Sequence, residues 1–325
     1  MINTSQRAFS KDVLKIDPKT EIDRICAFIR DSVAKQFRKK GAVVALSGGI
    51  DSSVTAALCA RALGKQRVMG LMLPEKESSQ ETIDLSRLMA DTLEIEQVYQ
   101  DITEVLEAAG CYHKRNTAFQ AVLPEYADGY TAKIVLPNIL EEGGYNLFYL
   151  VARSPEGKQI RKRLSYESYL GILAASNFKQ RVRAMMTYHH ADQRNYAVAG
   201  TSNLLEHDQG FFVKLGDGAG DLKPITHLYK SQVYALAAYL DVPQDIQERP
   251  PTPDTYPLDQ TAQEFYFSIP LETYDLCMYA EKHDVPAADA ADALDLTVEQ
   301  VERILGNIKQ KRRSTEYLHR TLSLL

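Results

Sequence analysis

The segment SGGIDSS, Ser47 to Ser53, constrains the fold of this chain more than any other stretch. It follows the apolar run AVVAL at 42–46 and precedes VTAALCARAL, whose small and apolar residues suit a buried helix. Two glycines let the backbone approach a ligand closely, while amides, hydroxyls and a helix N-terminus attract anions. The pattern therefore predicts a strand, an anion-binding turn and a helix in succession.

The same alternation of strand-like and helix-like segments continues along the chain. Strands are expected at 67–74, 95–100 and 195–200, and helices at 81–93 and 228–240. Strands that alternate with helices form parallel sheets covered on both faces, and ligands bind beyond the carboxyl ends of the strands. We predict an α/β fold with a parallel sheet of about five strands flanked by helices.

Two regions depart from this alternation. Residues from about 110 to 165 are rich in Gly, Tyr and Pro and are interpreted as an insertion, within which 146–164 predicts a hairpin turning at SPEG. A helix is expected from Tyr166 to His190, and about the last 65 residues are helical and more polar. We therefore divide the chain into a main domain, 1–260, and a helical C-terminal subdomain, 261–325.

Composition limits the partners and the compartment. Among 325 residues, 38 Lys and Arg face 43 Asp and Glu, a net charge of −5 that gives no global attraction to nucleic acids or membranes. The four cysteines lie far apart without metal-binding spacing, which predicts reduced thiols. With neither a signal-peptide core nor a run of ~20 apolar residues, the chain is expected to be cytoplasmic with no membrane partner.

The residues of SGGIDSS indicate which anion the turn binds. Ser47, Ser52 and Ser53 can donate hydrogen bonds to phosphate oxygens, and the amides of Gly48 and Gly49 add to them. The segment has no lysine of the G-x-x-x-x-G-K-[ST] type, and Asp51 instead suggests a magnesium ion bridging to pyrophosphate. The alternative is a helix capped by Asp and Ser after a tight glycine turn.

A second block, Asn177 to Leu240, carries further candidates. Thr201 stands at the end of an expected strand and Glu206 lies five residues on, so a hydroxyl and a carboxylate can reach the same phosphate and metal ion. Asn177 and Arg181 share one face of a helix. The alternatives are a solvated first-turn carboxylate and a solvated basic helix.

Together, the two blocks resemble the ATP pyrophosphatases, whose signature is SGG-x-DS[ST], and within them the ammonia-dependent NAD synthetases. The resemblance implies an adenine nucleotide alpha-hydrolase-like fold and a reaction in two steps. ATP adenylates the carboxylate of deamido-NAD with release of pyrophosphate, and ammonia then displaces AMP to give NAD. Magnesium is the implied metal.

The resemblance also implies roles for single residues. Asp51, Asp217 and Lys230 are the expected catalytic residues, with Lys230 on the ATP phosphates and Asp217 near the reacting amide. Thr201 and Thr252 are expected to contact ATP together with the SGGIDSS residues, while Asp51 and Glu206 hold magnesium. The expected acceptor-binding residues are Asn177, Arg181, Lys214, Asp221, Gln310 and Lys311.

Some segments depart from the family pattern on the acceptor side. The family's Q-x-D-E appears here as Gln260 to Glu264 with an acidic residue lost, and its H-K-R-x-P appears as QKRRS from Gln310. An amide synthetase acting on another carboxylate therefore stays open as the alternative. A homodimer is expected from the resemblance alone, and ammonia is expected to be free or delivered by a separate glutaminase.

A rival interpretation is a nucleic-acid-binding protein. Residues 284–313 suggest two short helices, the second capped by Thr297 with Gln300 three residues on and followed by KQKRR, similar to a helix-turn-helix. Glu299 and Glu302 near the start of the second helix would face the bases, and the chain is acidic overall. Nucleic-acid binding is therefore disfavoured.

Overall fold

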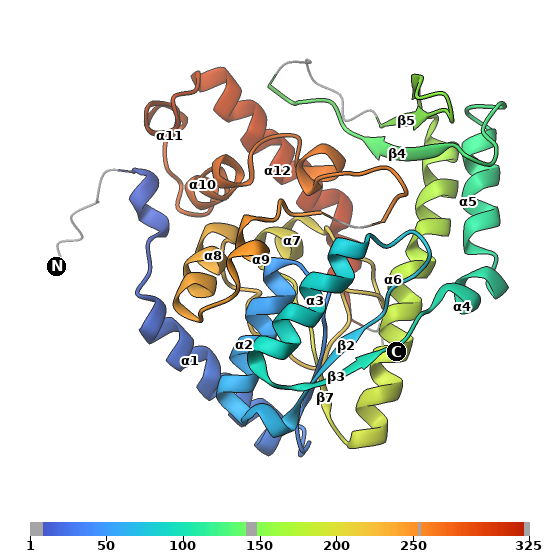
Figure 1. Cartoon of the computed structure of the whole chain (residues 1–325). Helices are drawn as coiled ribbons and strands as arrows, with labels where there is room; N and C mark the ends of the chain where they lie inside the picture. Colours follow the sequence, from blue (N-terminus) through green and yellow to red (C-terminus); the bar gives the residue numbers. More distant parts are fainter. Residues whose placement is uncertain (1–8, 141–147, 253–254, 322–325) are drawn as a thin grey trace, which may run out of the picture.

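A four-stranded parallel sheet lies at the centre of the computed structural model, which describes residues 9–140, 148–252 and 255–321 (Figure 1). Its strands, in the spatial order β3-β2-β1-β7, are β3 (Glu96–Tyr99), β2 (Val68–Met72), β1 (Ala42–Ala45) and β7 (Ala197–Ala199). The predicted α/β class is confirmed. The sheet has four strands where about five were expected, because beyond β7 the chain returns only as a single bridge between Ala199 and Leu222.

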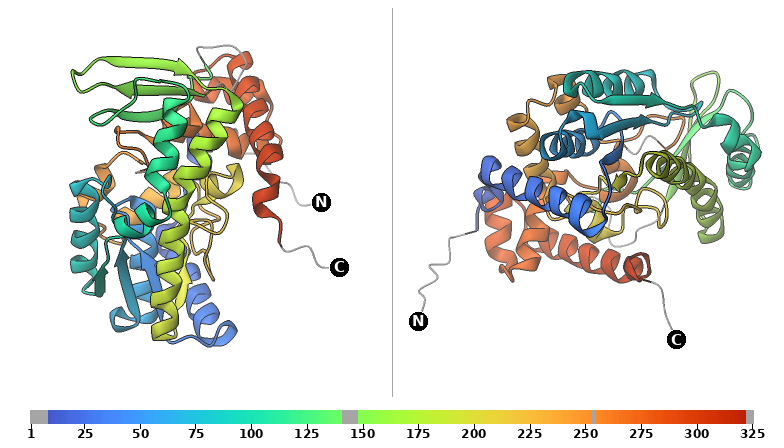
Figure 2. Two further views of the ribbon diagram at one scale, coloured as in Figure 1. Left: turned by 90° about the vertical axis from the view of Figure 1, so that its right-hand side faces the viewer. Right: turned by 90° about the horizontal axis from the view of Figure 1, so that it is seen from below.

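Helices cover both faces of the sheet, as the continuous apolar runs of β1 and β2 require. One face packs against α1 (Pro18–Asp31), α2 (Ile50–Leu63), α3 (Gln80–Leu93) and α8 (Lys230–Tyr239). The other face packs against α4 (Thr103–Ala108) and α6 (Tyr166–Arg194), with α5 (Cys111–Gln120) beside them. Helix α6 runs along one whole side of the molecule (Figure 2).

The region expected as an insertion contains more regular structure than its sequence suggested. The predicted hairpin is confirmed as β5 (Tyr149–Arg153) and β6 (Gln159–Arg163), although Asn146 and Leu147 at its start lie outside the described residues. Strand β4 (Thr131–Val135) pairs with β5 to complete an antiparallel sheet, and helix α5 was not predicted at all. The sheet's apolar face, including Ile134 and Leu150, packs on Phe119 of α5.

The C-terminal region is helical, as predicted, and consists of α10 (Leu271–Lys282), α11 (Ala287–Leu294) and α12 (Val298–His319). The predicted cap of α12, Thr297 with Gln300, is confirmed. The interpretation as two short DNA-binding helices is wrong, because α12 has 22 residues and continues through the basic run KQKRR. Lys311 within that run is buried against the rest of the fold instead of facing solvent.

The remaining elements are short. They are the helices α7 (Leu204–Gln209) and α9 (Gln244–Glu248) and the helical turns η1 (Lys11–Leu14), η2 (Ser32–Gln36), η3 (Lys65–Arg67) and η4 (Gln263–Phe267). All four cysteines are free and buried, as expected for reduced thiols. Among the described residues, no helix combines the length and the apolar character needed to cross a membrane.

The packing of Phe119 gives a test of how the inserted sheet is held. Its ring is fully buried among residues of β4, β5 and α6, so Phe119→Ala should lower the free energy of unfolding by about 3–5 kcal/mol. Val298→Ala, at a residue that is 45% exposed, should change it by less than about 0.5 kcal/mol. Denaturant unfolding measures both, and equal effects would contradict the assigned packing.

Candidate functional site

One cavity of about 1490 Å³ opens at the carboxyl ends of β1, β2 and β7, where parallel sheets bind their ligands. Most of the predicted site residues line it. These are Ser47, Gly49, Asp51, Ser52, Asn177, Arg181, Thr201, Glu206, Lys214, Asp217, Lys230, Thr252, Gln310 and Lys311. Gly48, Ser53 and Asp221 do not line it.

The glycine turn has the geometry of an anion cradle. Gly48 adopts φ +68°, and a Cβ there would lie 2.8 Å from the carbonyl oxygen of Thr82, so only glycine fits. Ser52 lies 3.2 Å from the hydroxyl of Ser47, and both side chains face the cavity. The hydroxyls of Ser52 and Ser53 both donate to the Gly49 carbonyl, at 3.0 and 2.9 Å, and of these two serines only Ser52 lines the cavity.

Asp51, Lys230 and Glu206 form the charged centre of the site. The ammonium of Lys230, at the start of α8, makes an ion pair with Asp51 in the first turn of α2. Asn203 connects this pair to Glu206: its side-chain nitrogen donates to Asp51 Oδ1 at 3.0 Å, and its side-chain oxygen caps α7 by accepting from the Glu206 amide at 3.0 Å. Three segments distant in sequence thus meet at one point.

The protonation of this centre follows from its charges. Burial and the nearby charge of Asp51 raise the pKa of Glu206 to about 8. Burial opposes the charge of Lys230, but Asp51 and Glu206 outweigh burial and raise the pKa of Lys230 above its ordinary value. At neutral pH the ligand-free centre therefore holds a charged Lys230 and a largely protonated Glu206.

The donor set suits a magnesium ion bound together with phosphates. Within the described ranges, no group of three or more His, Cys, Asp or Glu side chains is arranged to hold a metal ion by itself. Magnesium usually binds through one or two carboxylates plus substrate phosphates, and Asp51 and Glu206 supply two carboxylates beside the glycine turn. Burial and the charge of Asp51 both raise the pKa of Glu206, and a divalent cation would oppose both effects by favouring the ionised carboxylate.

Further along the cavity lie the residues predicted to bind the acceptor. Arg181 of α6 donates to the Lys214 carbonyl at 3.4 Å, and the Lys214 ammonium donates to the carbonyls of Tyr317 and Arg320, each at 3.0 Å. Asp217 accepts from the Val213 amide at 2.6 Å, which fixes its carboxylate at the cavity wall. These contacts tie α6, the loop at 211–218 and the end of α12 together.

Asp221 lies apart from the other predicted acceptor residues. Its carboxylate accepts from the Val198 amide at 2.8 Å, within β7, and contacts the hydroxyl of Tyr188 at 3.5 Å. A carboxylate bonded to the edge of the sheet stabilises the loop that follows β7. Asp221 is exposed to solvent and both of its partners line the cavity, so its contact with the acceptor stays a prediction.

Lys311 is an unusual member of the wall. It is 5% exposed, donates to the Tyr266 carbonyl at 2.6 Å, and lies 4.4 Å from the centre of the Tyr266 ring. Burial lowers the pKa of Lys311 to about 7, so its ammonium loses a proton much more readily than an exposed lysine does. Gln310, its neighbour, also faces the cavity.

Two residues of the site were missed from the sequence. Asn203 carries a detectable signal, because Asn followed three residues later by Glu is the pattern of a capping box. Arg249 has no such local signal, because its contacts join positions far apart in the chain. It donates to the Thr82 hydroxyl at 2.7 Å and to the Ser47 carbonyl at 3.3 Å.

Comparison with known families and sequences identifies relatives of the whole chain. Residues 21–123 and 157–318 match the family described as NAD synthase. A protein of Rhizobium meliloti named NH(3)-dependent NAD(+) synthetase is 50% identical over 96% of this chain and 93% of its own length. A protein of the same name from Thermotoga neapolitana is 34% identical over 90% of this chain and 93% of its own length. The chain therefore belongs to the NAD synthase family.

Solved structures share the fold at lower identity. An NMN synthetase from Francisella tularensis has a TM-score of 0.64 and 23% identity, covering 96% of this chain and 99% of that one. An NH3-dependent NAD synthetase from Campylobacter jejuni has a TM-score of 0.62 and 21% identity, covering 95% of this chain and 100% of that one. The family match leaves residues 124–156 uncovered, and these hold β4 and β5 of the antiparallel sheet.

The raised pKa of Glu206 predicts a pH effect on the stability of the ligand-free protein. Between its ordinary pKa and about 8, the folded chain holds a proton that the unfolded chain has lost, so the contribution of Glu206 to stability falls as pH rises through this window. Glu206→Gln removes that titration. The Tm of the variant minus that of the wild type should therefore increase from pH 5 to pH 8.

Thermal unfolding without ATP or magnesium measures this difference. Glu299→Gln, at a carboxylate that is 82% exposed, is the matched control and should give a nearly constant difference. A difference for Glu206→Gln that is constant or decreases with pH would contradict the assignment.

Proposed function

We propose that this member of the NAD synthase family uses ATP to join ammonia to the carboxylate of deamido-NAD, giving NAD, AMP and pyrophosphate. The names and coverage of its relatives support the substrate. The observation that carries the proposal is the position of Lys230 and Asp51 at the glycine turn, in the same cavity as Arg181, Lys214 and Asp217.

In the first step an oxygen of the acceptor carboxylate attacks the α-phosphorus of ATP, and the bond to the β-phosphate oxygen breaks. Pyrophosphate leaves with that oxygen, so negative charge grows beside the glycine turn. The amide of Gly49, the hydroxyls of Ser47 and Ser52, and the Lys230 ammonium lie where they can stabilise this charge. Thr201 and Thr252, which also line the cavity, are the further proposed ATP contacts.

Magnesium, when bound by Asp51 and Glu206, would offset charge on the phosphates. The ion pair with Asp51 keeps the Lys230 ammonium beside the glycine turn, within reach of the phosphates. Arg181 and Lys214 orient the acceptor by binding its anionic groups, and a guanidinium suits this because it can donate two parallel hydrogen bonds. Asn177, Gln310 and Lys311 complete the proposed acceptor wall.

In the second step ammonia attacks the carbonyl carbon of the acyl-adenylate. The bond from this carbon to the AMP oxygen breaks, AMP leaves with that oxygen, and nitrogen gives up a proton. Asp217, held by the Val213 amide and facing the cavity, is the proposed proton acceptor. Each turnover thus makes one C–N bond and one bond from the α-phosphorus to the former carboxylate oxygen. It breaks one C–O bond of the acceptor and the bond from the α-phosphorus to the β-phosphate oxygen.

The product assay is the direct test. Purified protein with ATP, magnesium, deamido-NAD and ammonium should form NAD, AMP and pyrophosphate in equal amounts. Asp51→Asn, which keeps the side-chain shape but removes the charge that binds Lys230, should lose at least ~100-fold in kcat/KM.

Two results would contradict the proposal. Formation of ADP and phosphate would exclude cleavage between the α- and β-phosphates. Release of AMP with another carboxylate, but not with deamido-NAD, would instead identify an amide synthetase for a different acceptor.

The mouth of the cavity also supports a homodimer. Tyr166, Leu170 and Tyr317 border the cavity and are 77%, 43% and 67% exposed, although large apolar side chains are usually buried. A second copy packed on this rim would cover them and close the acceptor end. We propose that the active form is a dimer built on α6 and the end of α12.

Light scattering after gel filtration tests the dimer. The wild type should have twice the mass of the 36.5 kDa chain. Leu170→Glu, which keeps helix propensity but adds a charge to the rim, should shift the protein toward the monomer and reduce NAD formation. Leu88→Glu, the same change at an exposed leucine of α3, should do neither. A monomeric wild type, or a dimeric Leu170→Glu variant, would overturn the interface.

A further inference from the structure

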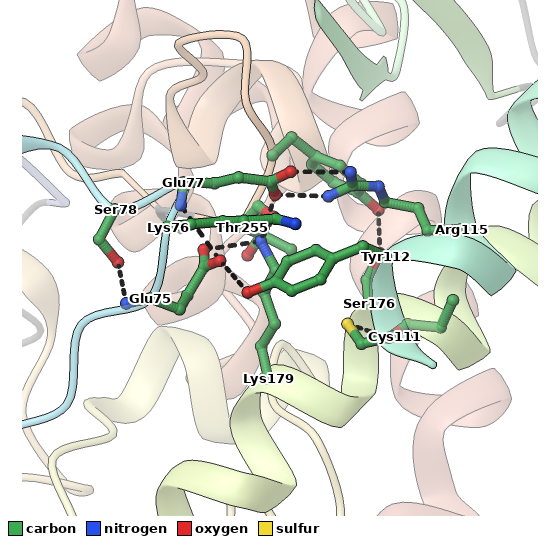
Figure 3. A network of polar contacts seen from close by, with 12 residues as sticks. Glu75, Lys76, Glu77, Ser78, Cys111, Tyr112, Arg115, Ser176, Lys179 and Thr255 are labelled. Carbon is green, nitrogen blue, oxygen red and sulfur yellow. Dashed lines mark hydrogen bonds and ion pairs between the residues drawn. The ribbon is translucent and has the colours of Figure 1, made fainter. Parts of the chain in front are cut away.

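A buried network of charged side chains lies beside the cavity, outside the phosphate site (Figure 3). Its centre is Lys179 of α6, which is 1% exposed. The ammonium of Lys179 donates to Glu75 Oε1 at 2.8 Å, to Glu77 Oε2 at 2.7 Å and to the Thr255 carbonyl at 2.8 Å. All three of its donors are therefore used.

The carboxylates of the network have further partners on α5. The Tyr112 hydroxyl donates to Glu75 Oε2 at 2.7 Å, and the Arg115 guanidinium binds Glu77 through both of its terminal nitrogens. Two acidic and two basic side chains thus neutralise one another. Burial would raise the pKa of Glu77, but Arg115 and Lys179 outweigh burial and keep that pKa below its ordinary value.

The network reaches the cavity through the segment that contains Thr255. We call residues 249–252 and 255–256 the crossing segment, because Arg249, Pro250, Pro251 and Thr252 line the cavity along with Thr255 and Tyr256. One end is held where Arg249 bonds to Thr82 and Ser47. The other end is held on α6, by Lys179 at the Thr255 carbonyl and by Ser176 at the Tyr256 hydroxyl, 3.4 Å away.

The acidic partners of Lys179 belong to a second stretch of the cavity wall. Glu75 and Glu77 follow β2, whose extension Leu73–Pro74 lines the cavity, and the Glu75 amide donates to Ser78, another lining residue. Lys179 therefore joins both the loop after β2 and the crossing segment to α6. The Arg249 end of the crossing segment lies at the glycine turn, where its guanidinium donates to the Ser47 carbonyl at 3.3 Å.

We propose that Lys179 is a positioning residue that fixes the crossing segment across the nucleotide half of the cavity. Lys179 does not itself line the cavity and acts through Thr255, which does. The inference rests on the proposed function only in that ATP occupies this half. A residue that merely stabilised the fold would affect unfolding but not the affinity for ATP.

The test removes the hold on Thr255 without leaving an unpaired charge. Lys179→Met combined with Glu75→Gln keeps the apolar stem and leaves Glu77 paired with Arg115. The matched control, Arg115→Met combined with Glu77→Gln, removes another largely buried ion pair, and it leaves Lys179 paired with Glu75 and bonded to the Thr255 carbonyl.

Two measurements distinguish the pairs of changes. The KM and Kd for ATP should rise roughly tenfold or more in the Lys179→Met pair, because a charged hydrogen bond to the segment is lost, while kcat changes less. Hydrogen exchange without ATP should become faster for the amides of Thr255, Tyr256 and Leu258. The control pair should keep the wild-type ATP affinity and exchange.

The outcomes separate this inference from the proposed function. ATP binding by calorimetry and hydrogen exchange need no acceptor, so they remain informative if deamido-NAD gives no product. Unchanged ATP affinity and exchange in the Lys179→Met pair would overturn the inference, as would equal losses in both pairs. If neither double variant folds, the wild type alone still tests the inference. Backbone amides of Thr255 and Tyr256 that exchange as fast as those of an exposed loop would overturn it.

Discussion

The ion pair between Lys230 and Asp51 is the contact on which the rest of the site depends. It joins the start of α8 to the first turn of α2, and Asn203 adds α7 through the other oxygen of Asp51. The carboxyl ends of β1 and β7 bring these helices together, because neighbouring parallel strands end at the same edge of a sheet. Separating Lys230 from Asp51 would leave two carboxylates, Asp51 and Glu206, facing each other without a cation.

The C-terminal helices support this pair from behind. Asp275 of α10 is fully buried and accepts from the Ser231 amide at 3.0 Å, so it caps α8 directly beside Lys230. Burial raises the pKa of Asp275 to about 6, a cost that its contacts with the helix N-terminus only partly offset. The C-terminal helices therefore support the charged centre as well as the cavity wall, to which α12 contributes Gln310 and Lys311.

The parts of the site that could be predicted are those written in contiguous sequence. The turn at SGGIDSS is indicated by seven consecutive residues. Thr201 and Glu206 lie only five residues apart, at the end of one strand and in the short helix that follows it. Lys179 and Glu75 lie 104 residues apart, and nothing near either residue indicates its partner. The roles of Ser53 and Asp221 stay predictions, because a hydroxyl or carboxylate that can reach a ligand can equally bond to a nearby backbone group, as both do here. Helix α5 was missed because its residues lack an apolar stripe, and packing against α6 stabilises it instead.

We propose that one cavity brings the phosphates of ATP to the acceptor carboxylate before ammonia takes part. Isotope exchange between labelled pyrophosphate and ATP measures this step alone. With magnesium, ATP and deamido-NAD but no ammonium, label should enter ATP at a rate that depends on the deamido-NAD concentration, and Asp51→Asn should abolish the exchange. Exchange that proceeds equally well without any acceptor, or no exchange until ammonium is added, would contradict the account.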